Sequence, residues 1–267
     1  MKLTARQVEK PWGRRELPAP FINATGEKIG EIWFEHGQRS DLPFLTKYIF
    51  TSERLSVQVH PDDMQAAARG NERGKTECWF VIDADPGAEI GLGLARSSTP
   101  GQLRSAAIDG SVMDLLNWRK VAPGDFFHVP AGTVHAIGAG VSLLEFQQNS
   151  DITYRLYDYG RPRELHLDDA IDVASLAPYS RASSKPVTMS PSILHSGDDF
   201  TVVKARSNGD VPAALNDRLR WVMPIAGKVR SNGDVAEAGE CLLLEPAAPI
   251  RIDEKSVALI AAGGAIR

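Results

Sequence analysis

The chain has 267 residues, of which 43% are hydrophobic and 24% are charged. This length suits one large domain, or one sizeable domain and a small second one. A net charge of -4 gives no reason to expect nucleic acid or an anionic membrane as a partner. There is no signal-peptide core and no apolar run near the ~20 residues that span a bilayer. Because Cys78 and Cys241 form no paired spacing, a reducing compartment, the cytoplasm, is expected.

Residues 43–159 read mostly as short strands rich in Val, Ile, Phe and Leu, separated by Gly, Pro and Asp turns. The expected strands are 45–50, 54–60, 77–83, 126–130, 142–148 and 152–159. Short strands at this spacing predict a β-sandwich or a barrel.

The strand pattern breaks at about residues 98–120, where apolar residues recur at roughly helical intervals. Thr99 or Ser98 is placed to cap a helix there, and Pro100 suits its first turn. We therefore expect a helical insertion in the β structure. A second helix is expected at 164–176, after the last strand.

The composition changes after residue 176. Residues 177–194 are rich in Ser and Pro and lack periodicity, so they are expected to link two domains. The first domain would comprise residues 1–176, and a smaller β domain would comprise residues 195–267. The run VAPGDFFHVPAG resembles VAEAGECLLLEPAA in its turn, strand and following proline, which indicates either a duplicated β module or a chance similarity.

The stretch SVQVHPDD, residues 56–63, contains the first candidate site residues. Gln58 and His60 are two residues apart, so they face one side of a strand while Val57 and Val59 face the other. Two polar donors therefore converge on one space.

Glu77 and His135 are the next candidates. Glu77 shares a strand face with apolar residues, where a carboxylate needs a partner, and His135 follows the turn at 130–132. Each alone is more often a structural residue than a ligand. With Gln58 and His60, however, they offer two imidazoles, a carboxylate and an amide oxygen on three strands. This N/O set predicts a divalent metal, zinc first, with manganese, iron or nickel also compatible.

The run GDFFHVPAGTVH, from Gly124 to His135, satisfies the second motif of the cupin family, G-x5-P-x-G-x2-H, although Ala139 replaces the usual later asparagine. The first cupin motif is present in modified form, with QVH in place of HxH. This resemblance implies a mainly β fold: a cupin jelly-roll β-barrel with the helical insertion. A smaller, degenerate cupin-like β domain would follow it.

Several runs together resemble the type I mannose-6-phosphate isomerases in their short bacterial form. They occur in the family's order across about residues 8–175: PWG, GEIW, LPFLTK, LSVQVHPDD, GKTECW, PAGTVHAIG and NSDITYRLYDYGR. The resemblance implies a metal-dependent aldose–ketose isomerase that interconverts mannose 6-phosphate and fructose 6-phosphate through an enediolate.

The same resemblance implies one zinc ion per chain with four ligands, Gln58, His60, Glu77 and His135. It also places Lys75, Asp151 and Arg155 in the active site. The proton carrier stays open among Lys75, Glu145 and Asp151, and Lys75 could equally be a solvated lysine. Arg155 offers a planar fork for phosphate, or could be a structural partner of Asp151 or Glu145.

Two other functions are compatible with these residues. A cupin dioxygenase using iron or manganese usually wants two or three histidines and open positions for oxygen, whereas Gln58 replaces one histidine here. A sugar-phosphate-binding cupin without turnover is the non-enzymatic alternative. A complete ligand set beside Lys75, Asp151 and Arg155 favours the isomerase. His128 and Lys47 lie near the motifs but are left outside the expected site.

Overall fold

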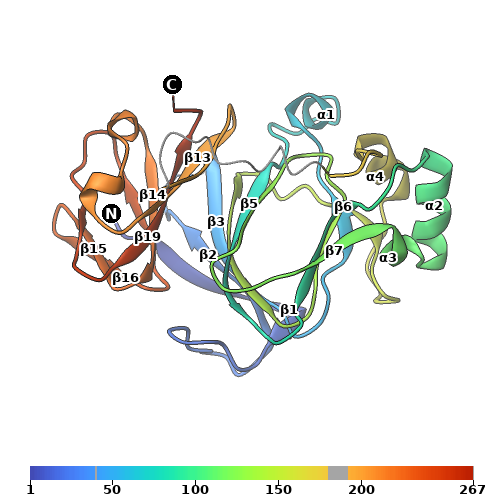
Figure 1. Cartoon of the computed structure of the whole chain (residues 1–267), viewed down its shortest axis with the longest axis horizontal. Coiled ribbons are helices and arrows are strands. Elements are labelled where there is room, and N and C mark those ends of the chain that lie inside the picture. The colour runs from blue at the N-terminus through green and yellow to red at the C-terminus, as the bar shows by residue number, and fades with distance from the viewer. Residues whose placement is uncertain (40, 180–191, 267) are drawn as a thin grey trace.

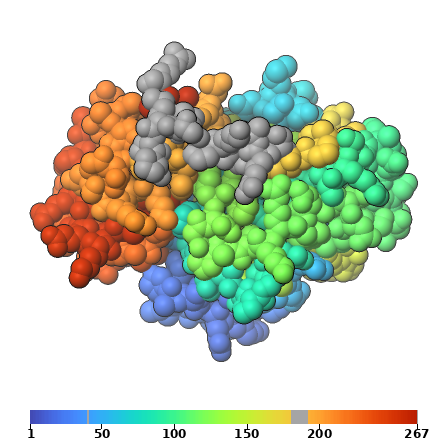
Figure 2. Space-filling view, in the orientation of Figure 1, coloured from blue at the N-terminus to red at the C-terminus, as the bar shows by residue number. Residues whose placement is uncertain are grey.

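The computed structural model describes residues 1–39, 41–179 and 192–266. The protein is mainly β, with a barrel-like module built from two sheets and a smaller C-terminal module, orange to red in Figure 1. Space-filling atoms of the two modules are in direct contact (Figure 2). Among the described residues, no helix is both long and apolar enough to cross a membrane.

The barrel-like module contains two antiparallel sheets. The first has the strand order β1-β2-β3-β10-β5-β8. Its strands are β1 (Thr4–Arg14), β2 (Ile29–Glu35), β3 (Phe44–Phe50), β5 (Glu77–Ala84), β8 (Phe126–Val129) and β10 (Val141–Gln148). The second has the order β11-β4-β9-β6-β7. Its strands are β4 (Val57–Val59), β6 (Glu89–Leu94), β7 (Leu116–Lys120), β9 (His135–Ile137) and β11 (Tyr154–Tyr157).

Apolar side chains join the two sheets of the barrel. Trp79 and Leu143 of the first sheet share a buried cluster with Ile90 and Ile137 of the second. Removing such surface from water is the main force that holds two sheets face to face. All strands expected between residues 43 and 159 are present, as β3, β4, β5, β8, β10 and β11.

Three helices lie together on the outside of the second sheet, at the right of Figure 1. They are α2 (Pro100–Asp109), α3 (Val112–Leu115) and α4 (Leu167–Val173). The hydroxyl of Thr99 accepts the Gln102 N–H and so caps α2 as expected.

The expected helical insertion extends too far at its C-terminal end. The helices end at Leu115, and residues 116–120 form β7, which pairs with β6. The prediction of helix through residue 120 was therefore wrong for this segment, because pairing with the open edge of β6 outweighs a weak helical pattern.

The C-terminal module has a five-stranded sheet of order β12-β13-β19-β14-β17 and a three-stranded sheet of order β16-β15-β18. Its strands are β12 (Ile193–Ser196), β13 (Phe200–Ala205), β14 (Arg220–Ala226), β15 (Lys228–Ser231), β16 (Asp234–Glu237), β17 (Leu242–Leu244), β18 (Arg251–Ile252) and β19 (Val257–Gly263). Two 3-10 turns, η2 (Asn208–Asp210) and η3 (Ala213–Leu215), connect β13 to β14. Of the expected linker, 180–191 lies outside the described residues, and its last two residues belong to β12.

Aromatic side chains pack the two modules together. Phe44 and Phe146 of the barrel lie 5.5 Å from Trp221 and 5.2 Å from Phe200, respectively, measured between ring centroids. The N-terminus adds backbone pairing, because the Leu3 N–H donates to a carbonyl that precedes β17. The modules therefore share one buried interface that fixes their relative position.

Candidate metal centre and active site

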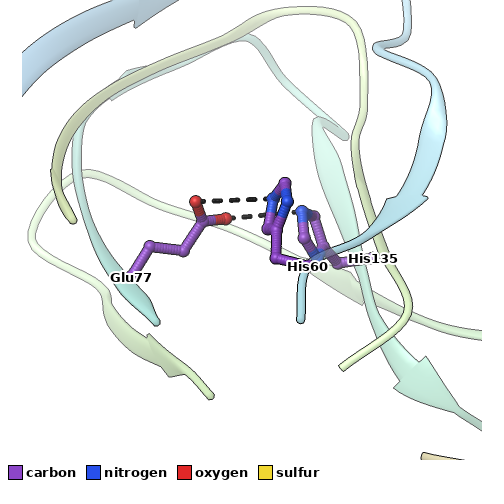
Figure 3. Close-up of side chains that lie close together, drawn as sticks. All are labelled: His60, Glu77 and His135. Carbon is purple, nitrogen blue, oxygen red and sulfur yellow. Dashed lines mark ion pairs between the residues drawn. The ribbon is translucent and has the colours of Figure 1, made fainter. Parts of the chain in front are cut away.

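Three buried side chains converge at one end of the barrel. Glu77 begins β5, His135 begins β9, and His60 follows β4 directly. The Glu77 carboxylate lies before both imidazole rings (Figure 3), with Oε2 3.7 Å from His60 Nε2 and Oε1 3.3 Å from His135 Nε2. One ligand atom from each residue lies within 4.8 Å of the others. The strands thus bring together three of the expected metal ligands.

Two close chain crossings hold these strand ends in place. The Lys75 N–H donates to the Pro61 carbonyl at 2.9 Å, which brings the segment before β5 beside His60. A Cβ on Gly74 would lie 2.5 Å from that same carbonyl oxygen, so only glycine allows the crossing. The Gly132 N–H donates to the His60 carbonyl at 2.8 Å and so ties the turn before β9 to β4.

The chain turns away from the barrel immediately after His60. Asp62 caps the short helix α1 (Asp63–Ala67), and Gln65 completes a reciprocal capping box with it. Val57 and Val59 are fully buried on the opposite face from Gln58, as their alternation predicts. This local pattern explains why the strand ends where its polar side chains meet the other donors.

Backbone carbonyls set the tautomers of both histidines. His60 Nδ1 lies 2.8 Å from the Ile152 oxygen, and His135 Nδ1 lies 2.9 Å from the Thr133 oxygen. A carbonyl only accepts, so each Nδ1 carries the proton and each Nε2 presents a lone pair. Burial lowers the pKa of His135 to about 4. Burial, together with the charge of Lys75, puts the pKa of His60 well below its ordinary value.

Both Glu77 carboxylate oxygens are buried and accept no hydrogen bond from the described residues. Lys75 Nζ makes an ion pair with Oε2 at 3.0 Å but lacks hydrogen-bond geometry to it. Acceptor oxygens left in this state are costly unless a cation satisfies them. The oxygens and the two Nε2 lone pairs together fit a metal cofactor.

Gln58 lies beside this cluster. It is paired with His135 across β4 and β9, and its amide nitrogen is 3.2 Å from His135 Nε2. The Ser56 hydroxyl donates to its amide oxygen at 3.1 Å. Because amide oxygen and nitrogen exchange places by a half-turn, Gln58 is able to present oxygen to the same space.

A buried carboxylate adjoins the cluster on β10. Glu145 Oε2 accepts from the Trp79 indole at 2.9 Å, and its Oε1 lies 3.0 Å from Lys47 Nζ. Burial and the nearby charge of Glu77 raise the pKa of Glu145 above its ordinary value. Lys47, which was left outside the expected site, thus contacts Glu145 directly. Its position follows from the pairing of Lys47 with Glu145 across β3 and β10, which the sequence alone does not reveal.

Arg155 and Asp151 differ in their placement. Arg155 is the β-partner of Gln58, so both side chains project from the same face beside the cluster. Its Nε is buried and has no partner among the described residues, and burial lowers its pKa. It forms no ion pair with Asp151 or Glu145 in the described chain. Asp151 is exposed, and the structure does not bring its carboxylate into the cluster.

Comparisons with known proteins give the family. No family model matches the chain. A mannose-6-phosphate isomerase from Streptococcus mutans is 39% identical over 220 residues, which are 77% of this chain and 69% of that protein. Mannose-6-phosphate isomerase ManA from Bacillus subtilis is 48% identical over 161 residues, which are 55% of this chain and 51% of ManA.

Solved structures agree over nearly the whole chain. The crystal structure of mannose 6-phosphate isomerase from Bacillus subtilis is 28% identical, with a TM-score of 0.83, and covers 97% of this chain and 98% of that chain. A zinc-bound mannose 6-phosphate isomerase is 15% identical with a TM-score of 0.72, covering 98% and 99%, and shares the fold. With these relatives, the cupin-like architecture and the convergent His60, Glu77 and His135, the chain belongs to the mannose-6-phosphate isomerase family.

Proposed function

We propose that this chain interconverts mannose 6-phosphate and fructose 6-phosphate at the end of the barrel. The observation that carries the proposal is that two Glu77 oxygens, which accept no hydrogen bond from the described residues, meet two histidine Nε2 lone pairs beside Lys75. The relatives from Streptococcus mutans and Bacillus subtilis bear the corresponding name. This favours the isomerase over a cupin dioxygenase or a binding protein without turnover.

We propose that one zinc ion is held by Gln58, His60, Glu77 and His135. Two neutral imidazoles, one carboxylate and one amide leave a divalent ion with a net positive charge. When bound, this ion supplies a Lewis acid that stabilises the negative charge developing on the sugar oxygens. The zinc-bound fold relative supports zinc over the other compatible metals.

The reaction also needs a group that moves a proton between C1 and C2 of the open sugar. Lys75 Nζ lies 3.3 Å from His60 Nε2, at the edge of the proposed metal site. Glu145 is buried, and its raised pKa brings a carboxylate closer to the range useful for proton exchange. These contacts favour Lys75 and Glu145 over the exposed Asp151 as the carrier.

Arg155 is the proposed phosphate ligand. Its guanidinium is partly buried beside Gln58, and its Nε has no acceptor among the described residues. A planar guanidinium matches two phosphate oxygens and gains most where water is partly excluded. The substrate would therefore lie with its phosphate toward Arg155 and its reacting carbons toward Glu77.

The chain's organisation and location are also proposed. Residues 1–176 would form the catalytic domain, followed by a connection that ends before β12, and the smaller domain would begin with β12 at Ile193. The protein would act in the cytoplasm on small sugar phosphates and bind neither nucleic acid nor membrane, in keeping with its net charge of -4.

The test is a coupled assay of mannose 6-phosphate conversion to fructose 6-phosphate on chain stripped with chelator and then titrated with zinc. The proposal predicts loss of activity on stripping and recovery near one bound equivalent at the barrel site. Absence of turnover with zinc, manganese, iron or nickel would return the protein to the binding or dioxygenase alternatives.

A further inference from the structure

A second group of metal-ligand side chains lies where the two modules meet, outside the barrel site. It consists of His128 on β8, His195 on β12 and Asp199 in the turn before β13, and is called here the junction cluster. We propose that the junction cluster binds a second divalent transition metal ion, which clamps the C-terminal module to the barrel.

The donor atoms of the junction cluster converge as those of the barrel site do. His128 Nε2 lies 3.0 Å from one carboxylate oxygen of Asp199, and His195 Nε2 lies 3.1 Å from the other. The two rings are stacked, with centroids 3.9 Å apart and planes 22° apart, so both nitrogens face the same carboxylate. One ligand atom from each of the three residues lies within 4.8 Å of the others.

The backbone around Asp199 fixes its carboxylate in this orientation. The Phe200 N–H donates to Oδ1 at 2.7 Å, and the Gly264 N–H donates to the Asp199 carbonyl at 3.0 Å. A Cβ on Gly197 would lie 2.6 Å from Asp199 Oδ1 and 2.8 Å from His195 Nε2. The turn therefore leaves room for the cluster only because residue 197 is glycine.

The charge of the junction cluster favours a cation. Asp199 supplies a carboxylate, a group that is ordinarily ionised at neutral pH and attracts a divalent cation. In the tautomer with its proton on Nδ1, each ring turns an Nε2 lone pair toward this carboxylate and fits a metal, whereas a proton on Nε2 would be donated to Asp199 instead.

The spacing requires little movement to accept zinc. Tetrahedral ligands ~2.0–2.1 Å from zinc lie about 3.3 Å from one another. The nitrogen–oxygen separations of 3.0 and 3.1 Å in the junction cluster are slightly shorter than this. The same separations also suit direct His–Asp hydrogen bonds, so a metal-free clip is the alternative that an experiment must exclude.

The position of the junction cluster gives the metal a structural role. His128 lies in a strand paired with β5, which begins at Glu77, whereas Asp199 is 71 residues further along the chain in the other module. Both histidine rings also contact Phe200, at centroid distances of 6.0 and 5.3 Å. An ion bound here would join the modules beside their aromatic interface and stabilise the folded chain through its binding free energy.

The experiment counts zinc in the full chain. Chelator-stripped protein is loaded with excess zinc, separated from free metal by gel filtration and measured by elemental analysis. The wild-type chain should retain two equivalents. Glu77→Gln should lose the barrel equivalent and retain the other, whereas Asp199→Asn should lose the junction equivalent and retain the barrel one. The two sites are thereby distinguished even if the proposed isomerase activity fails.

Two further variants separate a metal site from a hydrogen-bonded clip. His195→Gln keeps a side-chain amide able to donate to Asp199, yet should still lose the junction equivalent because imidazole is the better zinc ligand. His36→Gln, at a histidine outside both clusters, should retain two equivalents. If the wild-type chain retains only one zinc equivalent and Glu77→Gln retains none, the proposal is overturned, whether or not the junction variants fold.

Discussion

The turn that precedes β8 in the barrel and the turn that precedes β17 in the C-terminal module have the same hydrogen bonds. In the barrel, the Ala122 N–H donates to the Asp125 carboxylate at 2.8 Å. In the C-terminal module, the Glu237 N–H donates to the Glu240 carboxylate at 2.9 Å. The similarity between these two sequence runs therefore extends to their conformation, which favours duplication over chance.

The match continues residue by residue beyond the turns. Gly124 and Gly239 have φ values of 96° and 89°, and Gly132 and Ala247, after the strands, have φ values of 80° and 62°. In the sheets, Val129 pairs with Glu77 of β5 just as Leu244 pairs with Arg220 of β14. Arg220 thus occupies the position that Glu77 has in the barrel.

The two modules differ in the side chains at their corresponding strand positions. By the same correspondence, the C-terminal module places an apolar residue at each of three polar positions of the barrel: Ile250 for His135, Ile260 for Glu145 and Ala262 for Gln147. Ile260 and Ala262 belong to its buried apolar cluster. A repeated backbone therefore carries the proposed metal site in one copy and a packed apolar core in the other.

The largest expected effect is the difference between substituting Glu77 and substituting Arg220, its counterpart in the C-terminal module. Glu77→Gln removes the negative charge of a proposed metal ligand and should lower kcat/KM by at least about 100-fold, with loss of barrel zinc. Arg220→Gln, at the corresponding C-terminal position, should retain zinc and turnover, since it lies in no proposed site. Steady-state kinetics and elemental analysis measure both. Equal losses of activity in two folded variants would contradict the contrast between the modules.

The next effect concerns the proton carrier. Lys75→Met or Glu145→Gln should lower kcat by about 10²–10⁴-fold, as expected on losing a general acid–base group, while barrel zinc is retained. Ile260→Val, at the position that corresponds to Glu145, should leave kcat unchanged. If either barrel variant keeps full turnover, the residue that it replaces is not the proton carrier.

A smaller effect is expected at Arg155, the proposed phosphate ligand. Arg155→Ala should raise KM for mannose 6-phosphate by about 10–100-fold, because a hydrogen bond to a charged group contributes about 1.5–3 kcal/mol. Zinc content should not change, and Arg155→Lys should restore part of the loss. An unchanged KM in the alanine variant would assign Arg155 a structural role instead.

The smallest effect is expected in the turn after β17, which corresponds to the turn after β8 in the barrel. Ala247 has a positive φ where the barrel has Gly132. Ala247→Gly should raise Tm by about 2 °C, because relief of left-handed strain, ~1–2 kcal/mol, exceeds the entropic cost of glycine, ~0.5–1 kcal/mol. Calorimetry at fixed zinc measures the shift, and a lower Tm would show that Ala247 is not strained.

Much of the barrel site could be predicted from local sequence. Alternation placed Gln58 and His60 on one face, and the structure buries Val57 and Val59 on the other. The glycine and proline turn at 130–132 indicated the position of His135 in the same way. These features depend on a few consecutive residues, so a single sequence contains enough information for them.

Features that depend on strand pairing or module packing could not be predicted this way. Lys47 reaches Glu145 because β3 and β10 pair in one register, and His128 reaches Asp199 only after the modules pack. β6 and β9 were not predicted: β6 contains two glycines, and β9 has only three residues. Such strands show little alternation, and partners distant in sequence define them.

Anomalous diffraction at the zinc edge, from crystals of the active holoenzyme, tests the central claim most directly. We expect a peak in the barrel, about 2.0–2.2 Å from Nε2 of His60, Nε2 of His135 and a Glu77 carboxylate oxygen. Active crystals with no anomalous peak between these three side chains would contradict it.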